Sequence, residues 1–281
     1  MKVPERLQPL IEDGLIDEVL RPLKSGKEAS VWLVRCGNET RCAKVYKDAD
    51  RRSFRQAVQY REGRKVRNSR LARAMEKGSR YGREQQEAHW QNAEVDALYR
   101  LAAAGVRVPK PFGCFDGVLL MQMIADEDGG PAGRLADFDF SPEEARDFHQ
   151  RLLREVVRML CAGLVHGDLS EYNILVDVDG PVIIDLPQAV DAAGNNHAKA
   201  MLARDVQNLA TFFGQYAPAL LNSDYAPEIW DLYERGELQP GSRLTGIFEH
   251  DTRPADLDGL LREIQDAIAE EAARRAREAE G

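Results

Sequence analysis

The strongest constraint on the fold of this chain is a polar run at positions 166–173, followed by an aspartate at position 185. The run reads His166-Gly167-Asp168-Leu169-Ser170-Glu171-Tyr172-Asn173. Asn173 begins a short predicted strand, 173–176, and Asp185 ends a second one, 182–185, with a tight turn at 177–180 between them. Asp168, Asn173 and Asp185 are therefore expected to converge at one edge of a sheet.

Phosphoryl transfer requires the kinds of group that converge at this edge. One carboxylate orients the attacking hydroxyl, while an amide and a second carboxylate hold Mg²⁺ on the phosphates. An ordinary aspartate has a pKa of about 3.9, so we expect Asp168 to be ionised and to position the hydroxyl rather than act as a strong base. We interpret His166 as a structural residue that braces the loop. The alternative is a surface loop with two unrelated aspartates.

The first half of the chain is expected to bind a nucleotide. Predicted strands over 29–34 and 42–46 form a hairpin, and Lys44 lies in the second strand between apolar neighbours. A lysine in an apolar strand needs an anion nearby. Glu94 is the natural partner, because it lies on the apolar face of a predicted helix over 84–104. A Lys–Glu pair directed at phosphates is the arrangement of a kinase; the alternative is a surface lysine with an unrelated glutamate.

Four separate motifs occur in this order: Ser25-Gly26-Lys27-Glu28-Ala29-Ser30-Val31, Cys42-Ala43-Lys44-Val45-Tyr46-Lys47, His166 to Asn173, and Ile184-Asp185-Leu186-Pro187-Gln188-Ala189. Together they resemble the RIO family of atypical serine/threonine kinases, and most closely a bacterial form of its RIO-one subfamily. The resemblance covers about Leu23 to Phe213. It implies ATP as the cosubstrate with Mg²⁺ or Mn²⁺, and transfer of the γ-phosphoryl group to a protein hydroxyl, to the enzyme itself or to water.

The resemblance also implies roles for individual residues. Lys44 would be the ATP lysine with Glu94 as its pair, and Asp168 would be the catalytic aspartate. Asn173 and Asp185 would be the metal ligands, and Asp185 could itself accept the phosphoryl group. The cofactor-binding set is completed by a phosphate loop that is not of the Walker A type, Ser25, Gly26, Lys27, Glu28, Ala29, Ser30 and Val31, and by the segment beside adenine, Met121, Gln122 and Ile124.

The expected fold is α+β and of the two-lobed protein-kinase kind, with a small β-rich N-terminal lobe and a mostly helical C-terminal lobe. Residues 1–22 are predicted as an N-terminal helical extension, with a helix over 4–20. Residues 23–124 would form the N-lobe, with a basic insert at 48–83. Residues 125–281 would form the C-lobe, with the catalytic loop, the metal-binding strand and C-terminal helices.

The second half carries clear helix signals and lacks room for an activation loop. Ser141-Pro142-Glu143-Glu144 is a capping box with proline at the first helical position, and the helix that it begins is expected to end at Gly163. Further helices are predicted from Ala198 and from about Asp256. Only eleven residues separate Asp185 from His197, so we predict a RIO type without an activation loop.

Charge is distributed unevenly along the chain. Residues 51–83 contain twelve basic residues against Glu62 and Glu76, a net charge of +10, whereas the whole chain carries −9 and its remainder therefore −19. A cationic insert in an acidic protein suits a polyanion. An RNA or ribosomal partner for this insert is the resulting hypothesis; the alternative is a solvated loop.

Composition excludes several classes of protein. With 281 residues, of which 43% are hydrophobic and 30% charged, the chain has an ordinary globular composition. No apolar run approaches the roughly 18 residues of a membrane span, and the N-terminal residues lack the apolar region of a secretory signal. The four cysteines show no C-x-x-C spacing, so we expect reduced thiols and a cytoplasmic protein.

Two other functions stay open. The first is a small-molecule phosphotransferase of the aminoglycoside or choline kinase type, which would share H-G-D-x-x-x-x-N and a following aspartate but lack Ser-Gly-Lys-Glu-Ala. The second is an ATP-binding scaffold for RNA or the ribosome, against which the intact set of polar residues argues. Neither the phosphoryl acceptor nor the oligomeric state follows from the sequence.

Overall fold

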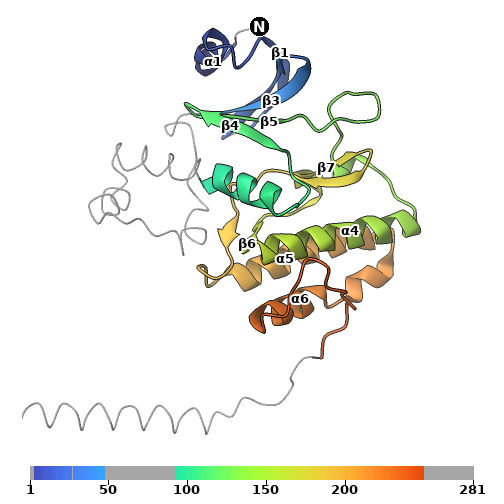
Figure 1. Ribbon diagram of the computed structural model, residues 1–281. Helices are drawn as coiled ribbons and strands as arrows, with labels where there is room; N and C mark the ends of the chain where they lie inside the picture. The colour runs from blue at the N-terminus through green and yellow to red at the C-terminus, as the bar shows by residue number, and fades with distance from the viewer. Residues whose placement is uncertain (1–2, 27, 48–92, 250–281) are drawn as a thin grey trace, which may run out of the picture. The chain divides into compact units, whose positions relative to one another are not determined.

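The computed structural model describes residues 3–26, 28–47 and 93–249. In this part of the chain an antiparallel β-sheet is followed by a mostly helical region, which is the predicted α+β class (Figure 1). The basic insert, the first part of the predicted helix over 84–104 and the last predicted helix lie outside the described residues. None of the described helices combines the length and apolarity needed to cross a membrane.

The sheet has five strands in the order β1-β2-β3-β5-β4, and every neighbouring pair is antiparallel. The predicted hairpin at its centre is confirmed. The strands are β1 Glu18–Ser25, β2 Ala29–Cys36, β3 Glu39–Tyr46, β4 Pro111–Phe115 and β5 Val118–Gln122.

The two faces of the sheet are separated by the alternation of side chains along each strand. In β3, Ala43 and Val45 belong to the apolar cluster under α1, Gln8–Glu12, on the outer face of the sheet. Tyr46 belongs to the main core on the inner face, together with Leu98 and Leu101 of the helix that covers residues 93–103. Lys44 therefore projects from the inner face, towards that helix.

The predicted helix over 4–20 is wrong in its second half. A short 3-10 turn, Glu5–Leu7, leads into α1, which ends at Glu12, and Gly14 follows with a φ of 71°. A left-handed glycine is a common helix stop. The chain then enters β1, an edge strand, where Pro22 is tolerated because an edge needs fewer ladder hydrogen bonds.

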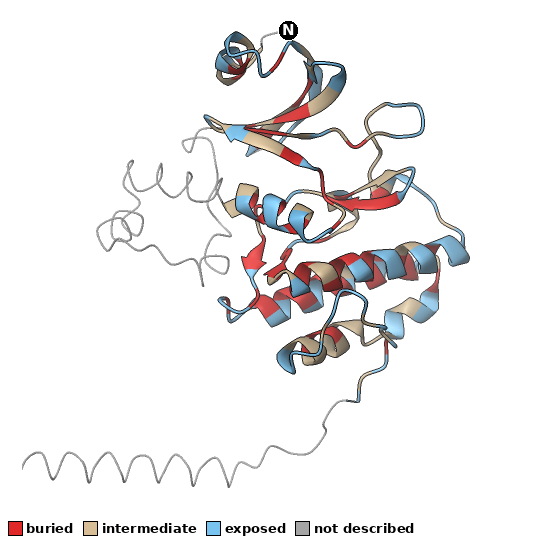
Figure 2. Cartoon of the chain, in the orientation of Figure 1, coloured by how far each residue is buried: buried red, intermediate tan, exposed pale blue. Residues whose placement is uncertain are grey.

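The helical region is organised around α4, Pro142–Cys161, which begins with the predicted capping box: Ser141 Oγ accepts from Glu144 N, and Glu144 Oε2 accepts from Ser141 N. One side of α4 is buried and the other exposed (Figure 2). Its buried residues pack on the two following helices, α5 Ala198–Gly214 and α6 Tyr225–Glu234.

Two short antiparallel pairs complete this region. The predicted hairpin is confirmed as β7 Ile174–Asp177 and β8 Gly180–Ile183. Asp185 was expected to end the second strand, but it lies two residues beyond β8. The second pair, β6 Leu164–Val165 with β9 Val190–Asp191, was not predicted, because its strands are two residues long. Residues 186–197, which lead from Asp185 to α5, contain only β9.

Candidate active site

A buried ion pair lies under the inner face of the sheet. Lys44 Nζ donates to Glu94 Oε1 at 2.5 Å, and the hydroxyl of Tyr46 donates to Glu94 Oε2 at 2.6 Å. Glu94 is 5% exposed, so both of its oxygens are satisfied inside the protein. This confirms the predicted contact between Lys44 and Glu94.

Lys44 also reaches the helical region, where its Nζ donates to Asp185 Oδ1 at 3.0 Å. Burial by itself would lower the pKa of Lys44, but the carboxylates of Glu94 and Asp185 outweigh burial and hold it above its ordinary value. Burial would likewise raise the pKa of Asp185, yet the ammonium of Lys44 brings that pKa below its ordinary value. Lys44 and Asp185 are therefore both charged at neutral pH.

The loop that contains Asp168 is braced by His166, as predicted. His166 is 1% exposed, its Nε2 contacts the carbonyl oxygen of Ile184 at 3.1 Å, and its Nδ1 accepts from the backbone N–H of Asp168 at 3.3 Å. In these two contacts Nδ1 is the acceptor and Nε2 faces a carbonyl oxygen. The histidine thus connects the loop to the residue that precedes Asp185.

Asn173 completes the loop by donating from Nδ2 to the carbonyl oxygen of Asp168 at 2.9 Å. The backbone N–H of Ile184 donates to the carbonyl oxygen of Asn173 at 2.9 Å, which places Asn173 beside the segment that carries Asp185. Burial raises the pKa of Asp168, although the nearby side chains of His166 and Arg204 oppose this shift. The structure therefore brings Asp168, Asn173 and Asp185 together at one edge, as their spacing predicts.

A buried aspartate of α5, which was not predicted from the sequence, holds the same loop. Asp205 is 1% exposed, and its two carboxylate oxygens accept from the backbone N–H groups of Gly167 and Leu169, each at 2.8 Å. Arg204 donates to the carbonyl oxygen of Gly167 and Asn208 to that of Leu169. The sequence did contain a signal for this residue: Asp205 lies on the apolar stripe of a helix, together with Leu202, Val206 and Leu209.

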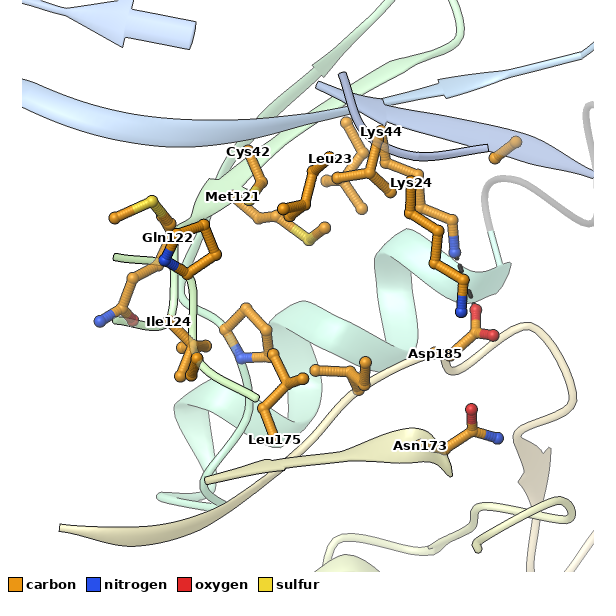
Figure 3. Close-up of a pocket in the computed structure, with 18 of the residues that line it drawn as sticks. Leu23, Lys24, Cys42, Lys44, Met121, Gln122, Ile124, Asn173, Leu175 and Asp185 are labelled. Carbon is orange, nitrogen blue, oxygen red and sulfur yellow. Dashed lines mark hydrogen bonds and ion pairs between the residues drawn. The ribbon is translucent and has the colours of Figure 1, made fainter. Parts of the chain in front are cut away.

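A cavity of about 620 Å³ lies between the sheet and the helical region. This volume is within the usual range of small-molecule sites. Lys44, Asn173 and Asp185 lie at one end of the cavity, and Met121, Gln122 and Ile124 lie at the other (Figure 3). One end is thus polar, and the other is formed largely by apolar side chains.

Most of the predicted cofactor-binding residues line this cavity. They are Gly26, Glu28, Ala29, Val31, Lys44, Glu94, Met121, Gln122, Ile124 and Asn173. Ser25 and Ser30 do not line it: they pair with each other across β1 and β2, one position out of step with the inward-facing Val31. Asp168 lies beside the cavity in its loop and is not part of its lining. Lys27 is outside the described residues.

Several lining residues were not predicted. Leu23, Lys24, Cys42, Leu175 and Arg134 belong to this group. Cys42 could have been found, because it lies two residues before Lys44 and therefore shares its face of the strand. Burial raises the pKa of this thiol to about 11, so it is a neutral wall of the cavity.

The donor set at the polar end fits a magnesium ion that is shared with a nucleotide. Mg²⁺ is usually bound by one or two carboxylates together with substrate phosphates, and Asp185 supplies a charged carboxylate beside the amide of Asn173. Among the described residues no group of three or more His, Cys, Asp or Glu side chains could hold a metal alone.

An antiparallel sheet over a helical region, with a Lys–Glu pair and an Asp–Asn–Asp edge at one cavity, defines the protein-kinase class of fold. A family model for the RIO domain matches residues 30–226. The chain belongs to the RIO family. Its relatives include the RIO-type serine/threonine-protein kinase Rio1 of Haloferax volcanii, which is 36% identical over 207 residues, or 73% of this chain and 66% of that protein.

Two eukaryotic relatives match at similar levels. The serine/threonine-protein kinase rio1 of Schizosaccharomyces pombe is 29% identical over 260 residues, which cover 87% of this chain and 48% of that protein. The human serine/threonine-protein kinase RIO1 is 30% identical over 214 residues, covering 75% of this chain and 36% of that protein. The matched regions thus span between about a third and two thirds of these relatives.

Proposed function

We propose that this protein is a RIO-type serine/threonine kinase that transfers the γ-phosphoryl group of ATP to a protein hydroxyl, to itself or to water. The observation that carries the proposal is the position of Lys44, whose ammonium contacts Glu94 at 2.5 Å and Asp185 at 3.0 Å at the polar end of the cavity. A lysine paired with a glutamate, beside an aspartate that can hold a metal ion, is the arrangement with which kinases bind the phosphates of ATP. The names of the relatives support the same activity.

The proposed roles follow from the geometry of the site. Lys44, oriented by Glu94, would bind the phosphates, and the apolar end of the cavity near Met121 would hold adenine. Asp185 and Asn173 would hold Mg²⁺, which supplies charge neutralisation on the phosphates. Asp168, at the rim of the cavity, would accept a hydrogen bond from the acceptor hydroxyl and align it.

The acceptor is the open part of this proposal. The short connection over residues 186–197 offers little support for a bound peptide, which favours transfer to water or to the protein itself. Asp185 is a candidate acceptor, because its ionised carboxylate lies at the phosphate end of the cavity. A phosphorylated Asp185 would be an acyl phosphate. Hydroxylamine cleaves an acyl phosphate but leaves serine and threonine phosphates intact.

One experiment tests the activity and the acceptor together. The full chain is incubated with γ-labelled ATP and Mg²⁺, and the label is separated into free phosphate, acid-stable protein phosphate and hydroxylamine-labile protein phosphate. We expect turnover in wild type and in Asp179→Asn, a matched control on the β7–β8 turn, and loss of turnover in Asp168→Asn. Equal turnover in wild type and Asp168→Asn, or no release or transfer of label by wild type, would refute the proposal.

We further propose an RNA or ribosomal partner and a cytoplasmic location. The first rests on the net charge of +10 over residues 51–83 and lies outside the described residues. The second is supported by four cysteines that are all free. Salt-dependent binding of a structured RNA by the full chain tests the partner, and retention of full affinity at high salt would argue against a phosphate-mediated contact.

A further inference from the structure

Besides Lys44, two cations among the described residues line the cavity. Three basic side chains line the cavity, Lys24, Lys44 and Arg134. Lys44 is bound by Glu94 and Asp185. No salt bridge holds Lys24 or Arg134 to a described residue; Arg134 acts on Asp185 through its charge, which helps to lower the pKa of that carboxyl.

Lys24 lies in the same cross-strand row as Lys44. In the register of the sheet, Lys24 pairs with Val31 of β2, and Val31 pairs with Lys44 of β3. Directly paired residues project from the same face and have Cβ atoms about 5 Å apart, so Lys24 lies on the inner face about 10 Å from Lys44. Figure 3 shows the two lysines projecting from the sheet towards the end of the cavity that holds Asp185.

Arg134 approaches the cavity from the opposite side. Its backbone forms a bridge with Leu175 of β7, and the carbonyl oxygen of Gly133 accepts from Val176 N at 3.0 Å. Leu175 and Asn173 are two residues apart, so Arg134 is attached beside the strand that follows the proposed metal ligand. The side chain is only half-buried, which leaves its guanidinium able to turn into the cavity.

The charges around the cavity explain why two further cations matter. The described part of the lining contains three cations and four acids, the acids being Glu28, Glu94, Asp137 and Asp185. Its formal charge is therefore −1, and a triphosphate adds several more negative charges. Because Lys44 is already neutralised by two carboxylates, it cannot compensate these charges alone. Phosphate charges in a partly buried site need further cations close to them.

We propose that Lys24 and Arg134 form a cationic clamp on the polyphosphate of the nucleotide, with Lys24 on the side of the sheet and Arg134 on the side of β7. The proposal rests on the proposed function, since it assigns residues to the same nucleotide site. Its consequence is selectivity: the clamp favours nucleoside triphosphates and diphosphates, and it contributes nothing to the binding of an uncharged nucleoside.

The test compares Lys24→Gln, Arg134→Gln and the double variant with wild type by isothermal titration of ATP, ADP and adenosine. Glutamine removes the charge and keeps a polar side chain of similar reach. We expect the Kd for ATP to rise about threefold for Lys24→Gln and about tenfold for Arg134→Gln, with roughly the product for the double variant. The Kd for adenosine should stay unchanged. Arg154→Gln, an exposed arginine of α4 away from the nucleotide cavity, is the matched control and should bind like wild type.

Each other outcome overturns the clamp. If the double variant binds ATP within twofold of wild type, neither side chain contacts the phosphates; if only one single variant is weakened, there is no clamp. If adenosine is weakened as much as ATP, the residues act on the structure of the site. Lys44→Met separates the two proposals. If Lys44→Met loses ATP binding while the Lys24→Gln/Arg134→Gln double variant binds ATP like wild type, the clamp alone is refuted. If the wild-type protein binds no ATP, the proposed function is refuted as well.

Discussion

The ammonium of Lys44 lies 3.0 Å from the carboxylate of Asp185, a residue 141 positions further along the chain. This contact joins a central strand of the sheet to the segment after β8, and it defines the polar end of the cavity. Lys44 also contacts Glu94, so one side chain connects three distant segments. The following predictions examine the residues that create this arrangement.

Removing the hydroxyl of Tyr46 should weaken the site without removing a charge. Tyr46→Phe leaves Glu94 Oε2 buried without its 2.6 Å hydrogen bond, and an unsatisfied buried acceptor costs about 1–3 kcal/mol. We expect a lower free energy of unfolding by about that amount and a higher KM for ATP. Chemical denaturation and initial rates measure the two effects. Tyr216→Phe is the control, because its hydroxyl has only longer contacts near the surface; equal effects of the two variants would contradict the role of Tyr46.

Asp168→Asn should separate chemistry from binding. The amide retains the shape of the side chain but orients a hydroxyl poorly, and we expect the turnover number to fall by about 10²–10⁴-fold. The Kd for ATP should change less than twofold, because Asp168 does not line the cavity. Single-turnover kinetics and calorimetry measure these two quantities. A parallel loss of ATP affinity would show that Asp168 belongs to the binding site instead.

Asp205→Asn should loosen the loop that carries Asp168. The carboxylate accepts two buried backbone N–H groups at 2.8 Å, whereas an amide offers one oxygen and turns a donor towards the other N–H. We expect a loss of about 2 kcal/mol in the free energy of unfolding together with a lower turnover number. Asp231→Asn is the control, because its ion pair with Arg235 is largely exposed and contributes little. A stable Asp205→Asn variant with full activity would show that the anchor is dispensable.

His149 should make the fold sensitive to mild acid. The ring is 1% exposed between Phe213 and Tyr225, and its Nε2 has no partner among the described residues. Burial lowers the pKa of His149 to about 4, against about 6.5 in an unfolded chain. Between these values the unfolded chain gains a proton that the folded chain does not. The contribution of the neutral His149 to the free energy of unfolding is therefore fully present above pH 6.5, and about 3 kcal/mol of it is lost as the pH drops to 4.

The measurement is the free energy of unfolding of wild type and His149→Leu at several pH values from 4 to 7. The variant should lose less stability on acidification, by about 1.4 kcal/mol per pH unit within that window. His197→Gln, which replaces an exposed histidine, should follow the wild-type profile. If wild type and His149→Leu have parallel profiles, His149 is not the group responsible.

Local patterns predicted the parts of the fold whose signals are complete within a few residues. The alternation of β2 and β3 and the capping box of α4 are examples, and both were found as predicted. The strands β1 and β4 were missed because each is an edge strand with a proline, Pro22 inside β1 and Pro111 at the start of β4, and each has a register shift. Such strands are held by one neighbour, so their own sequences carry a weak strand pattern.

The sequence alone determined which chemical groups the site contains: a lysine in an apolar strand, a glutamate on an apolar helix face, and two carboxylates and an amide around a short hairpin. Only the tertiary structure decided that Asp205 anchors the loop and that Lys24 and Arg134 face the cavity. The reason is physical. Motif spacing and strand alternation act between near neighbours in the chain, whereas these positions depend on which distant segments pack together.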